Sequence, residues 1–125
     1  MAKIILVDDE PSILSVLNVL LKAEGYEVTP VDGGDKALAI IKDHQFDLMI
    51  SDIRMKPVDG ITLLRAVREH QPAMAVLMVT GYGSVETAVE AMKLGAFDYI
   101  TKPFKVDEML ITVHRALEYN RTLTE

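Results

Sequence analysis

Residues 4–11 read IILVDDEP, and this stretch joins the features that decide the fold. An unbroken apolar run, rather than an alternating one, is typical of a strand that is covered on both faces of a parallel sheet. Pro11 suits the first position of a helix, where its missing N–H costs no hydrogen bond. The stretch therefore predicts a buried strand whose carboxyl end carries acidic side chains and leads directly into a helix.

The same succession of an apolar run and a helical segment recurs along the chain. The apolar runs are Ile4–Val7, Val28–Val31, Leu48–Ile50, Val76–Val79 and Phe97–Ile100. Strands that alternate with helices predict a parallel sheet with helices on both faces, which is an α/β fold. The sequence shows no internal repeat or linker, so its 125 residues predict a single domain.

Local signals indicate where the helices begin and end. Gly25 is expected to end the first helix in a left-handed conformation, Asp59 and Ser84 to cap the third and the fourth, and Gly95 to end the fourth. Helical spacing predicts an inner face of the fourth helix made of Val85, Ala88, Val89 and Met92. The last helix has no stop signal before the end of the chain, which leaves open a frayed terminus or a helix cut from a longer protein.

The composition excludes several classes of function. Thirteen Lys and Arg against nineteen Asp and Glu give a net charge of −6, which argues against direct binding of nucleic acid or of an anionic membrane. The absence of cysteine excludes disulfides, thiol catalysis and thiolate metal sites. The longest apolar run, Ala73–Val79, is too short to span a membrane, and the first run is too short for a secretory signal. We therefore expect a cytoplasmic protein.

Polar side chains follow the strands at the ends that hold ligands in open α/β sheets. Asp8 and Asp9 follow the first strand, and the other three are Asp52, Thr80 and Lys102, which follow the third, fourth and fifth strands. Two carboxylates about 4 Å apart repel by about 4 kcal/mol at an effective dielectric near 20, so Lys102 and a divalent cation are expected to balance them. Oxygen ligands without His or Cys favour a hard ion such as Mg²⁺. The set predicts a Mg²⁺-assisted phosphoryl-transfer site.

Each of these residues alone has an ordinary structural interpretation. An Asp after a strand is often a cap or turn residue, Thr80 suits a strand end, and Lys102 suits a solvated surface. The prediction therefore depends on their convergence at matching strand ends.

Five segments together resemble the receiver domain of two-component response regulators, over essentially the full length. They are Leu6–Pro11, Leu48–Met55, Asp59-Gly60, Val79–Gly81 and Asp98–Phe104. The chain from Gly81 to Tyr99 is more particularly similar to the nitrogen-regulation (NtrC-like) class, in which the receiver precedes an ATPase domain acting on σ54 RNA polymerase and a DNA-binding domain. The resemblance implies a flavodoxin-like doubly wound sheet of five parallel strands in the order 2-1-3-4-5. It also implies a receiver over residues 1–120, with 121–125 beginning a linker or continuing the last helix.

The resemblance implies a phosphoacceptor and a switch. Asp52 would accept a phosphoryl group from a sensor histidine kinase, Lys102 would pair with that group, and Thr80 would donate a hydrogen bond to it. Movement of Thr80 would let Tyr99 fill the vacated space. Alternatively, Tyr99 is an ordinary half-buried aromatic residue of the strand, with its hydroxyl in water. The surface of the fourth helix, fifth strand and fifth helix would then control homodimerisation and an output domain that this chain lacks.

The resemblance also implies a Mg²⁺ site. Asp9 and Asp52 would bind the ion together with the backbone carbonyl of Arg54, and Asp8 would act largely through water. Arg54 and Tyr82 occupy positions that tune the lifetime of the phosphoryl group in the family. We hypothesise that the bulk of Tyr82 hinders an attacking water molecule.

One position departs from the family pattern. Lys56 stands where the family usually has proline, and Pro57 follows it. Lys56 either adds positive charge near the phosphoryl group or is a solvated lysine.

Two other classes of protein fit the sequence less well. Haloacid-dehalogenase-like phosphatases need a second Asp two residues after the nucleophile, where this chain has Arg54. A nucleotide-binding flavodoxin-like domain is disfavoured because no glycine-rich loop or Walker lysine follows the first strand. The sequence therefore predicts a regulatory phosphoacceptor domain rather than an enzyme, with a phosphorylation-independent interaction module as the alternative.

Overall fold

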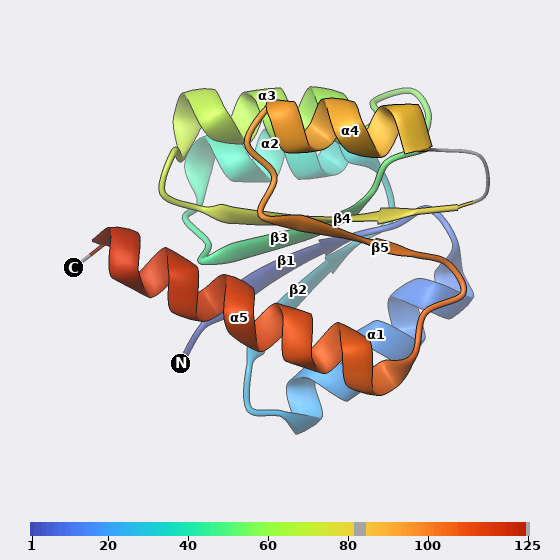
Figure 1. Ribbon diagram of the computed structural model, residues 1–125, viewed down its shortest axis with the longest axis vertical. Helices are drawn as coiled ribbons and strands as arrows, with labels where there is room; N and C mark the ends of the chain where they lie inside the picture. The colour runs from blue at the N-terminus through green and yellow to red at the C-terminus, as the bar shows by residue number, and fades with distance from the viewer. Residues whose placement is uncertain (82–84, 125) are drawn as a thin grey trace.

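A computed structural model describes residues 1–81 and 85–124 of the chain, with the backbone alone at 85 and 120–124. Strands and helices alternate throughout this part (Figure 1). The strands are β1 (Lys3–Val7), β2 (Glu27–Val31), β3 (Leu48–Asp52), β4 (Ala75–Thr80) and β5 (Asp98–Thr101). The helices are α1 (Pro11–Ala23), α2 (Gly34–Asp43), α3 (Gly60–His70), α4 (Val85–Lys93) and α5 (Val106–Thr124).

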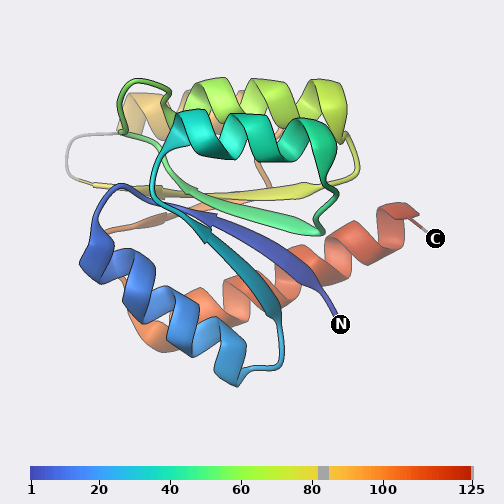
Figure 2. The same cartoon turned by 180° about the vertical axis from the view of Figure 1, so that it is seen from behind.

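The strands form one parallel sheet in the order β2-β1-β3-β4-β5, which confirms the predicted topology. Helices α1 and α5 cover one face, and α2, α3 and α4 cover the other (Figures 1 and 2). β3 lies at the centre, where Asp52 is in register with Val79 of β4, and β4 in turn pairs Thr80 with Thr101 of β5. The carboxyl ends of these three strands therefore meet at one edge of the sheet.

Successive residues of the central strands point into two separate hydrophobic cores. Ile5 and Met49 pack on the α2–α3–α4 side, whereas Ile4 and Leu48 pack on the α1–α5 side. All of β3 and β4 is buried, and both strands are apolar on both faces except at their carboxyl ends, where Ser51, Asp52 and Thr80 lie. This explains why an unbroken apolar run, rather than an alternating one, encodes them.

The predicted helix ends are confirmed where the structure describes them. Pro11 is the first residue of α1, and Gly25 follows the helix with φ of 92°. The side chain of Asp59 caps α3 by accepting a hydrogen bond of 2.8 Å from the backbone N–H of Thr62. Gly95 follows α4 with φ of 104°. The cap expected at Ser84 lies outside the described residues.

The predicted inner face of α4 is partly wrong. Ala88 is buried as expected, but Val89 is 47% exposed and Met92 is 39% exposed. Ala91 is buried in their place. Helical spacing with apolar residues on two adjoining faces does not say which face packs, and the short alanines face the sheet. The side chain of Val85 is outside the described part, so that position stays a prediction.

Helix α5 continues to Thr124, in agreement with the missing stop signal in the sequence. It starts at the edge of the sheet that carries Asp52 and ends beside the opposite edge (Figure 1). Within the described ranges, no helix is both long and apolar enough to cross a membrane.

Candidate functional site

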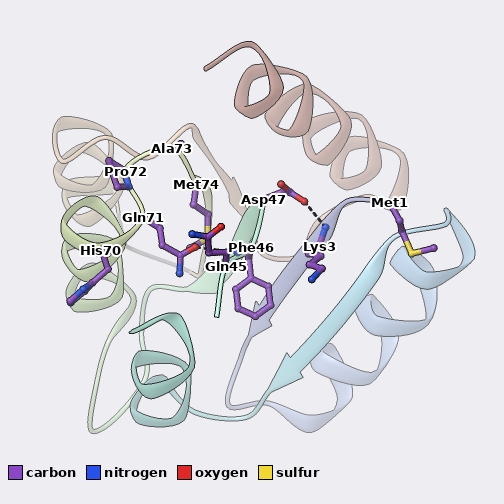
Figure 3. A pocket seen from close by; sticks show the side chains of 10 residues that line it. All are labelled: Met1, Lys3, Gln45, Phe46, Asp47, His70, Gln71, Pro72, Ala73 and Met74. Atoms are coloured by element: carbon purple, nitrogen blue, oxygen red, sulfur yellow. Dashed lines mark hydrogen bonds between the residues drawn. The ribbon is translucent and has the colours of Figure 1, made fainter. Parts of the chain in front are cut away.

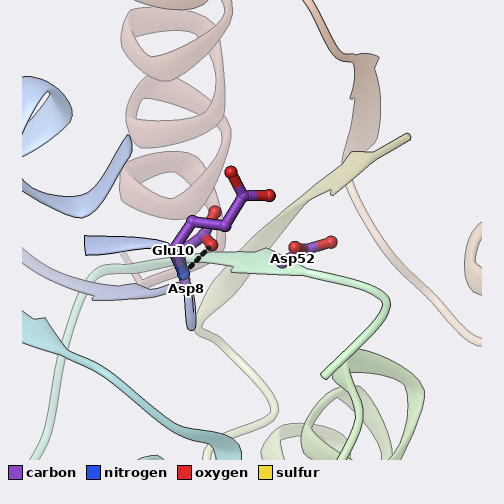
Figure 4. A group of neighbouring side chains, drawn as sticks. All are labelled: Asp8, Glu10 and Asp52. Atoms are coloured by element: carbon purple, nitrogen blue, oxygen red, sulfur yellow. Dashed lines mark hydrogen bonds between the residues drawn. The ribbon is translucent and has the colours of Figure 1, made fainter. Parts of the chain in front are cut away.

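An acidic cluster lies at the carboxyl edge of the sheet. Asp52 is the last residue of β3, and Asp8 and Glu10 belong to the segment between β1 and α1 (Figure 4). One carboxylate oxygen from each residue lies within 4.8 Å of the others. Asp8 and Asp52 are 2% and 6% exposed, whereas Glu10 is exposed. Three carboxylate oxygens that could bind a metal ion therefore lie close together at the carboxyl edge of the sheet.

The ammonium group of Lys102 lies at the centre of this cluster. Its Nζ is 3.0 Å from Oδ2 of Asp52, 3.2 Å from Oδ2 of Asp8 and 3.5 Å from Oε1 of Glu10. The backbone N–H of Lys102 donates to the carbonyl of Thr80 at 2.7 Å, which ties the lysine to the neighbouring strand. The predicted convergence of Asp8, Asp52 and Lys102 is thus present.

Burial and charge act against each other on these side chains. Burial raises the pKa of Asp8, although the N–H of Glu10, which donates to it at 2.9 Å, and the charge of Lys102 oppose the rise. Burial alone would lower the pKa of Lys102, but its hydrogen bond to Asp52 and the charges of both aspartates outweigh burial, so that pKa is raised. The site therefore favours a charged lysine and a carboxylate that resists ionisation.

Backbone contacts fix the position of the Asp52 side chain. The N–H of Arg54 donates to Oδ1 of Asp52 at 3.2 Å, and the N–H of Gly60 donates to the carbonyl of Ile53 at 2.8 Å. A Cβ atom at Gly60 would overlap the carbonyl oxygen of Asp52. The absence of a side chain there lets α3 start directly against the end of β3, so Gly60 is needed for this close approach.

The other predicted residues lie around the cluster. Asp9 is exposed and lines an adjoining hollow with Arg54, whose side chain is also exposed. Thr80 is buried at the end of β4, and its hydroxyl donates to the carbonyl of Gly81 at 3.2 Å. Tyr99 of β5 is 42% exposed. Tyr82 lies outside the described residues.

Glu10 is the site residue that sequence reasoning missed. It is the third of three consecutive acidic residues, which is the signal that the sequence offered. Asp8 folds the following segment into a turn by accepting the N–H of Glu10, and this turn brings the Glu10 carboxylate to the cluster. Nothing in the sequence distinguishes Glu10 from Asp9, because the turn decides which of them faces Asp52.

The donor set fits a small hard cation. All of its ligand atoms are carboxylate oxygens, which are the ligands that Mg²⁺ prefers. Lys102 supplies a single positive charge against the three carboxylates around it, so the cluster has unbalanced negative charge that a divalent ion would neutralise. The residues present therefore suit a divalent cation.

A second hollow lies at the opposite edge of the sheet (Figure 3). It is bordered by Lys3 and Asp47 and by the segment from His70 to Met74. The backbone N–H of Lys3 donates to the Asp47 carboxylate at 2.7 Å, so this pair is already engaged. The acidic cluster and Asp52 lie at the other edge, which makes that edge the candidate site.

The site combines a buried aspartate that ends the central parallel strand, two further carboxylates from the segment after β1, and a lysine that follows the edge strand β5. The chain matches the response regulator receiver domain family over residues 4–114. It belongs to this family.

Relatives support the expected likeness to the NtrC-like class. The chain is 41% identical over 120 residues to the transcriptional regulatory protein ZraR of Escherichia coli, covering 96% of this chain and 27% of that protein. The solved structure of NtrX from Brucella abortus is 38% identical with a TM-score of 0.92, covering 98% of this chain and 28% of that one. The solved structure of a receiver domain from Clostridium thermocellum is 34% identical with a TM-score of 0.93, and the match covers 98% of this chain and 99% of that one. The chain thus spans about a quarter of the length of the curated relatives that it matches.

Proposed function

We propose that Asp52 accepts a phosphoryl group from a sensor histidine kinase in a Mg²⁺-dependent reaction. The observation that carries this proposal is the position of Asp52, whose buried carboxylate ends the central strand 3.0 Å from the Lys102 ammonium. A carboxylate is an established nucleophile for forming an aspartyl phosphate. Family membership supports the same assignment.

In the proposed step, a carboxylate oxygen of Asp52 attacks the phosphorus of a phosphohistidine. A phosphorus–oxygen bond forms while the phosphorus–nitrogen bond breaks, and its electron pair returns to the imidazole, which then takes up a proton. The hydrogen bond from the Arg54 N–H orients the Asp52 carboxylate for this attack. Later attack by water would return the carboxylate and release inorganic phosphate.

Charge stabilisation comes from the residues around Asp52. Lys102 is placed to pair with the phosphoryl oxygens, and the Thr80 hydroxyl at the end of the next strand is placed to donate to them once it leaves the Gly81 carbonyl. A bound Mg²⁺ ion supplies charge neutralisation at the phosphoryl group. Asp8, Glu10 and Asp52 would hold it, and the sequence resemblance adds Asp9 and the carbonyl of Arg54 as further ligands.

The proposed output is a change of one surface. Phosphorylation replaces one negative charge by roughly two, which draws Thr80 toward the phosphoryl group and shifts the population of Tyr99 conformations. The side chains of Val89 and Met92 in α4 and of Tyr99 in β5 are exposed on the surface that these two elements form. Exposed apolar side chains of this kind suit a dimer that forms on phosphorylation. The output domain that such a dimer would control is transcriptional, as the names of the relatives indicate.

We also propose that the protein acts in the cytoplasm and makes no direct contact with nucleic acid or membrane. The receiver would cover residues 1–120, and residues 121–125 would begin a linker or continue the last helix. A phosphatase is a poor alternative because Arg54 stands where the general acid is needed. A phosphorylation-independent module would keep the fold and the surface but would not react at Asp52.

Mass spectrometry tests the phosphoacceptor directly. Incubation with Mg²⁺ and acetyl phosphate is expected to add one phosphoryl group to the chain, and Asp52→Ala or chelation of the metal is expected to prevent the addition. The Asp43→Ala variant, changed at an exposed carboxylate at the end of α2, serves as the matched control and should react normally. An unmodified wild-type chain under these conditions would leave the phosphorylation-independent module as the better description.

A further inference from the structure

Two cationic side chains that have no partner among the described residues border the hollow beside Asp52. The hollow lies between the segment that follows β3 and helix α4, with Asp9, Arg54, Lys56, Asp59 and Thr87 among its lining residues. The side chains of Arg54 and Lys56 are exposed, and neither makes a hydrogen bond or ion pair with another described residue. Their charges are therefore available to a molecule that enters the hollow.

The acidic cluster creates a problem for any phosphoryl donor. Asp8, Asp9, Glu10 and Asp52 lie at or beside the point of attack, and Lys102 alone balances them from within. A divalent cation would still leave the group with net negative charge. A phosphoryl group approaches as a dianion, so this charge opposes its arrival.

Lys56 and Arg54 have the charge that this approach requires. The carboxylate of Asp59 on the same hollow is engaged as the cap of α3, where the amino end of the helix offsets its charge. Among the described lining residues, Arg54 and Lys56 then carry two positive charges against the one negative charge of Asp9, so the rim is net positive. Lys56 lies in the segment between β3 and α3, four residues after Asp52, and its side chain is exposed.

We propose that Lys56 forms, together with Arg54, a positively charged rim that attracts dianionic phosphodonors into the hollow beside Asp52. Lys56 is then a specificity residue for the charge of the donor and does not take part in the chemical step. This inference rests on the proposed function, because it concerns the same reaction at Asp52.

Phosphorylation rates with two small donors test this role. Acetyl phosphate is a dianion, whereas phosphoramidate carries a protonated nitrogen that reduces its net charge. At low ionic strength, Lys56→Gln should slow reaction with acetyl phosphate by about two- to fivefold, the range for one exposed charge, and Lys56→Glu should slow it more. The loss should be smaller with phosphoramidate, and salt should reduce it because it screens exposed charges beyond a Debye length of about 8 Å at 0.15 M.

Two controls separate this effect from structural or metal effects. Lys56→Arg keeps the charge and should restore the rate, and Lys42→Gln removes an exposed charge from the far end of α2 and should change nothing. Mg²⁺ affinity should be unchanged or higher in Lys56→Gln, because the variant removes a cation that repels the metal. Lost metal therefore cannot explain a slower reaction.

The outcomes distinguish this inference from the function on which it rests. Failure of wild-type protein to gain a phosphoryl group would refute the phosphoacceptor proposal. Normal phosphorylation of wild type, with Lys56→Gln equally fast on acetyl phosphate at low salt, would refute the role of Lys56 alone. An equal loss with both donors at all salt concentrations would also refute it, because an electrostatic rim must respond to charge and screening.

Discussion

The Lys102 ammonium lies 3.0 Å from the carboxylate of Asp52, although the two residues are 50 positions apart in the chain. The parallel sheet brings them together, since β5 and β3 both end at the same edge and flank β4. The same ammonium lies 3.2 Å from Asp8, so one cation holds two buried carboxylates.

The first prediction concerns the stability that Lys102 contributes. At pH 8 Lys102→Met should lower the free energy of unfolding of the metal-free protein by about 1–3 kcal/mol, because it leaves buried acceptors without their donor. The pKa of Lys102 is raised in the folded state, so its contribution is present below its ordinary value of 10.5 and is lost as the pH rises through the higher folded-state value. Urea unfolding from pH 8 to 11.5 should show the two proteins converging above pH 10.5. A constant difference over this range would contradict the assignment.

The second prediction concerns Asp8 and metal. Burial raises the pKa of Asp8, so its ionised form destabilises the metal-free fold at neutral pH. Asp8→Asn should therefore increase the free energy of unfolding without metal. Mg²⁺ at ten times its Kd should stabilise wild type by about 1.4 kcal/mol and the variant by much less. Thermal unfolding with and without Mg²⁺ measures both effects, and Asp43→Asn at an exposed site should behave as wild type.

The third prediction concerns the close approach of α3 to β3. Gly60→Ala places a methyl group against the carbonyl of Asp52 and should destabilise the protein by about 1–3 kcal/mol. It should also slow phosphorylation, because the backbone that carries Asp52 must move. Gly33→Ala is the control, since its Cβ would meet only the movable end of the Asp35 side chain at 2.9 Å. Denaturant titration should rank the two variants clearly, and equal losses would contradict the steric argument.

These predictions depend on contacts that the sequence reveals to different degrees. The strands and the meeting of Asp52 with Lys102 could be predicted, because parallel strands bring their carboxyl ends to one edge, whereas the order of the strands came from the resemblance to receiver domains. The place of Glu10 could not, because a single turn bond to Asp8 decides which acidic side chain faces inward. The exposure of Val89 and Met92 could not be predicted either, because apolar periodicity does not distinguish a helix face that packs on the sheet from one that is exposed.

The fourth prediction separates the fold from the site. Gln71 accepts the N–H of Phe46 at 3.1 Å and donates to the carbonyls of Ile41 and His44 at 2.6 and 2.7 Å. Gln71→Ala should lower the free energy of unfolding by about 1–3 kcal/mol. Phosphorylation rate and Mg²⁺ affinity should be unchanged, because these bonds lie at the opposite edge of the sheet. The neighbouring Gln45→Ala, at an exposed side chain, should affect neither property.

The fifth prediction concerns the apolar surface of α4. Replacing Val89 and Met92 by Gln should change the stability of the monomer by less than about 0.5 kcal/mol per site, since both side chains are already exposed. The same double variant should abolish the dimer expected on phosphorylation, as measured by sedimentation before and after treatment with acetyl phosphate.

The matched control for this surface is a pair of exposed valines on the other face of the sheet. Val16 and Val19 of α1 are as exposed as the α4 residues, so changing them to Gln removes comparable apolar area. That variant should still dimerise. A dimer that survives the α4 changes and disappears with the α1 changes would contradict this prediction, because it would place the interface on the face that α1 covers.

Helix α5 joins the two edges of the sheet as a lever. It begins at Val106, shortly after Lys102, and its 19 residues extend for about 28 Å to Thr124 at the far edge. A tilt of about 5° around its first turn would move its last turn by about 2–3 Å over that length. Such a tilt would have to be accommodated by Met109, Val113 and Ala116, which pack into the core, and it would displace the helix most at the edge of the sheet opposite Asp52.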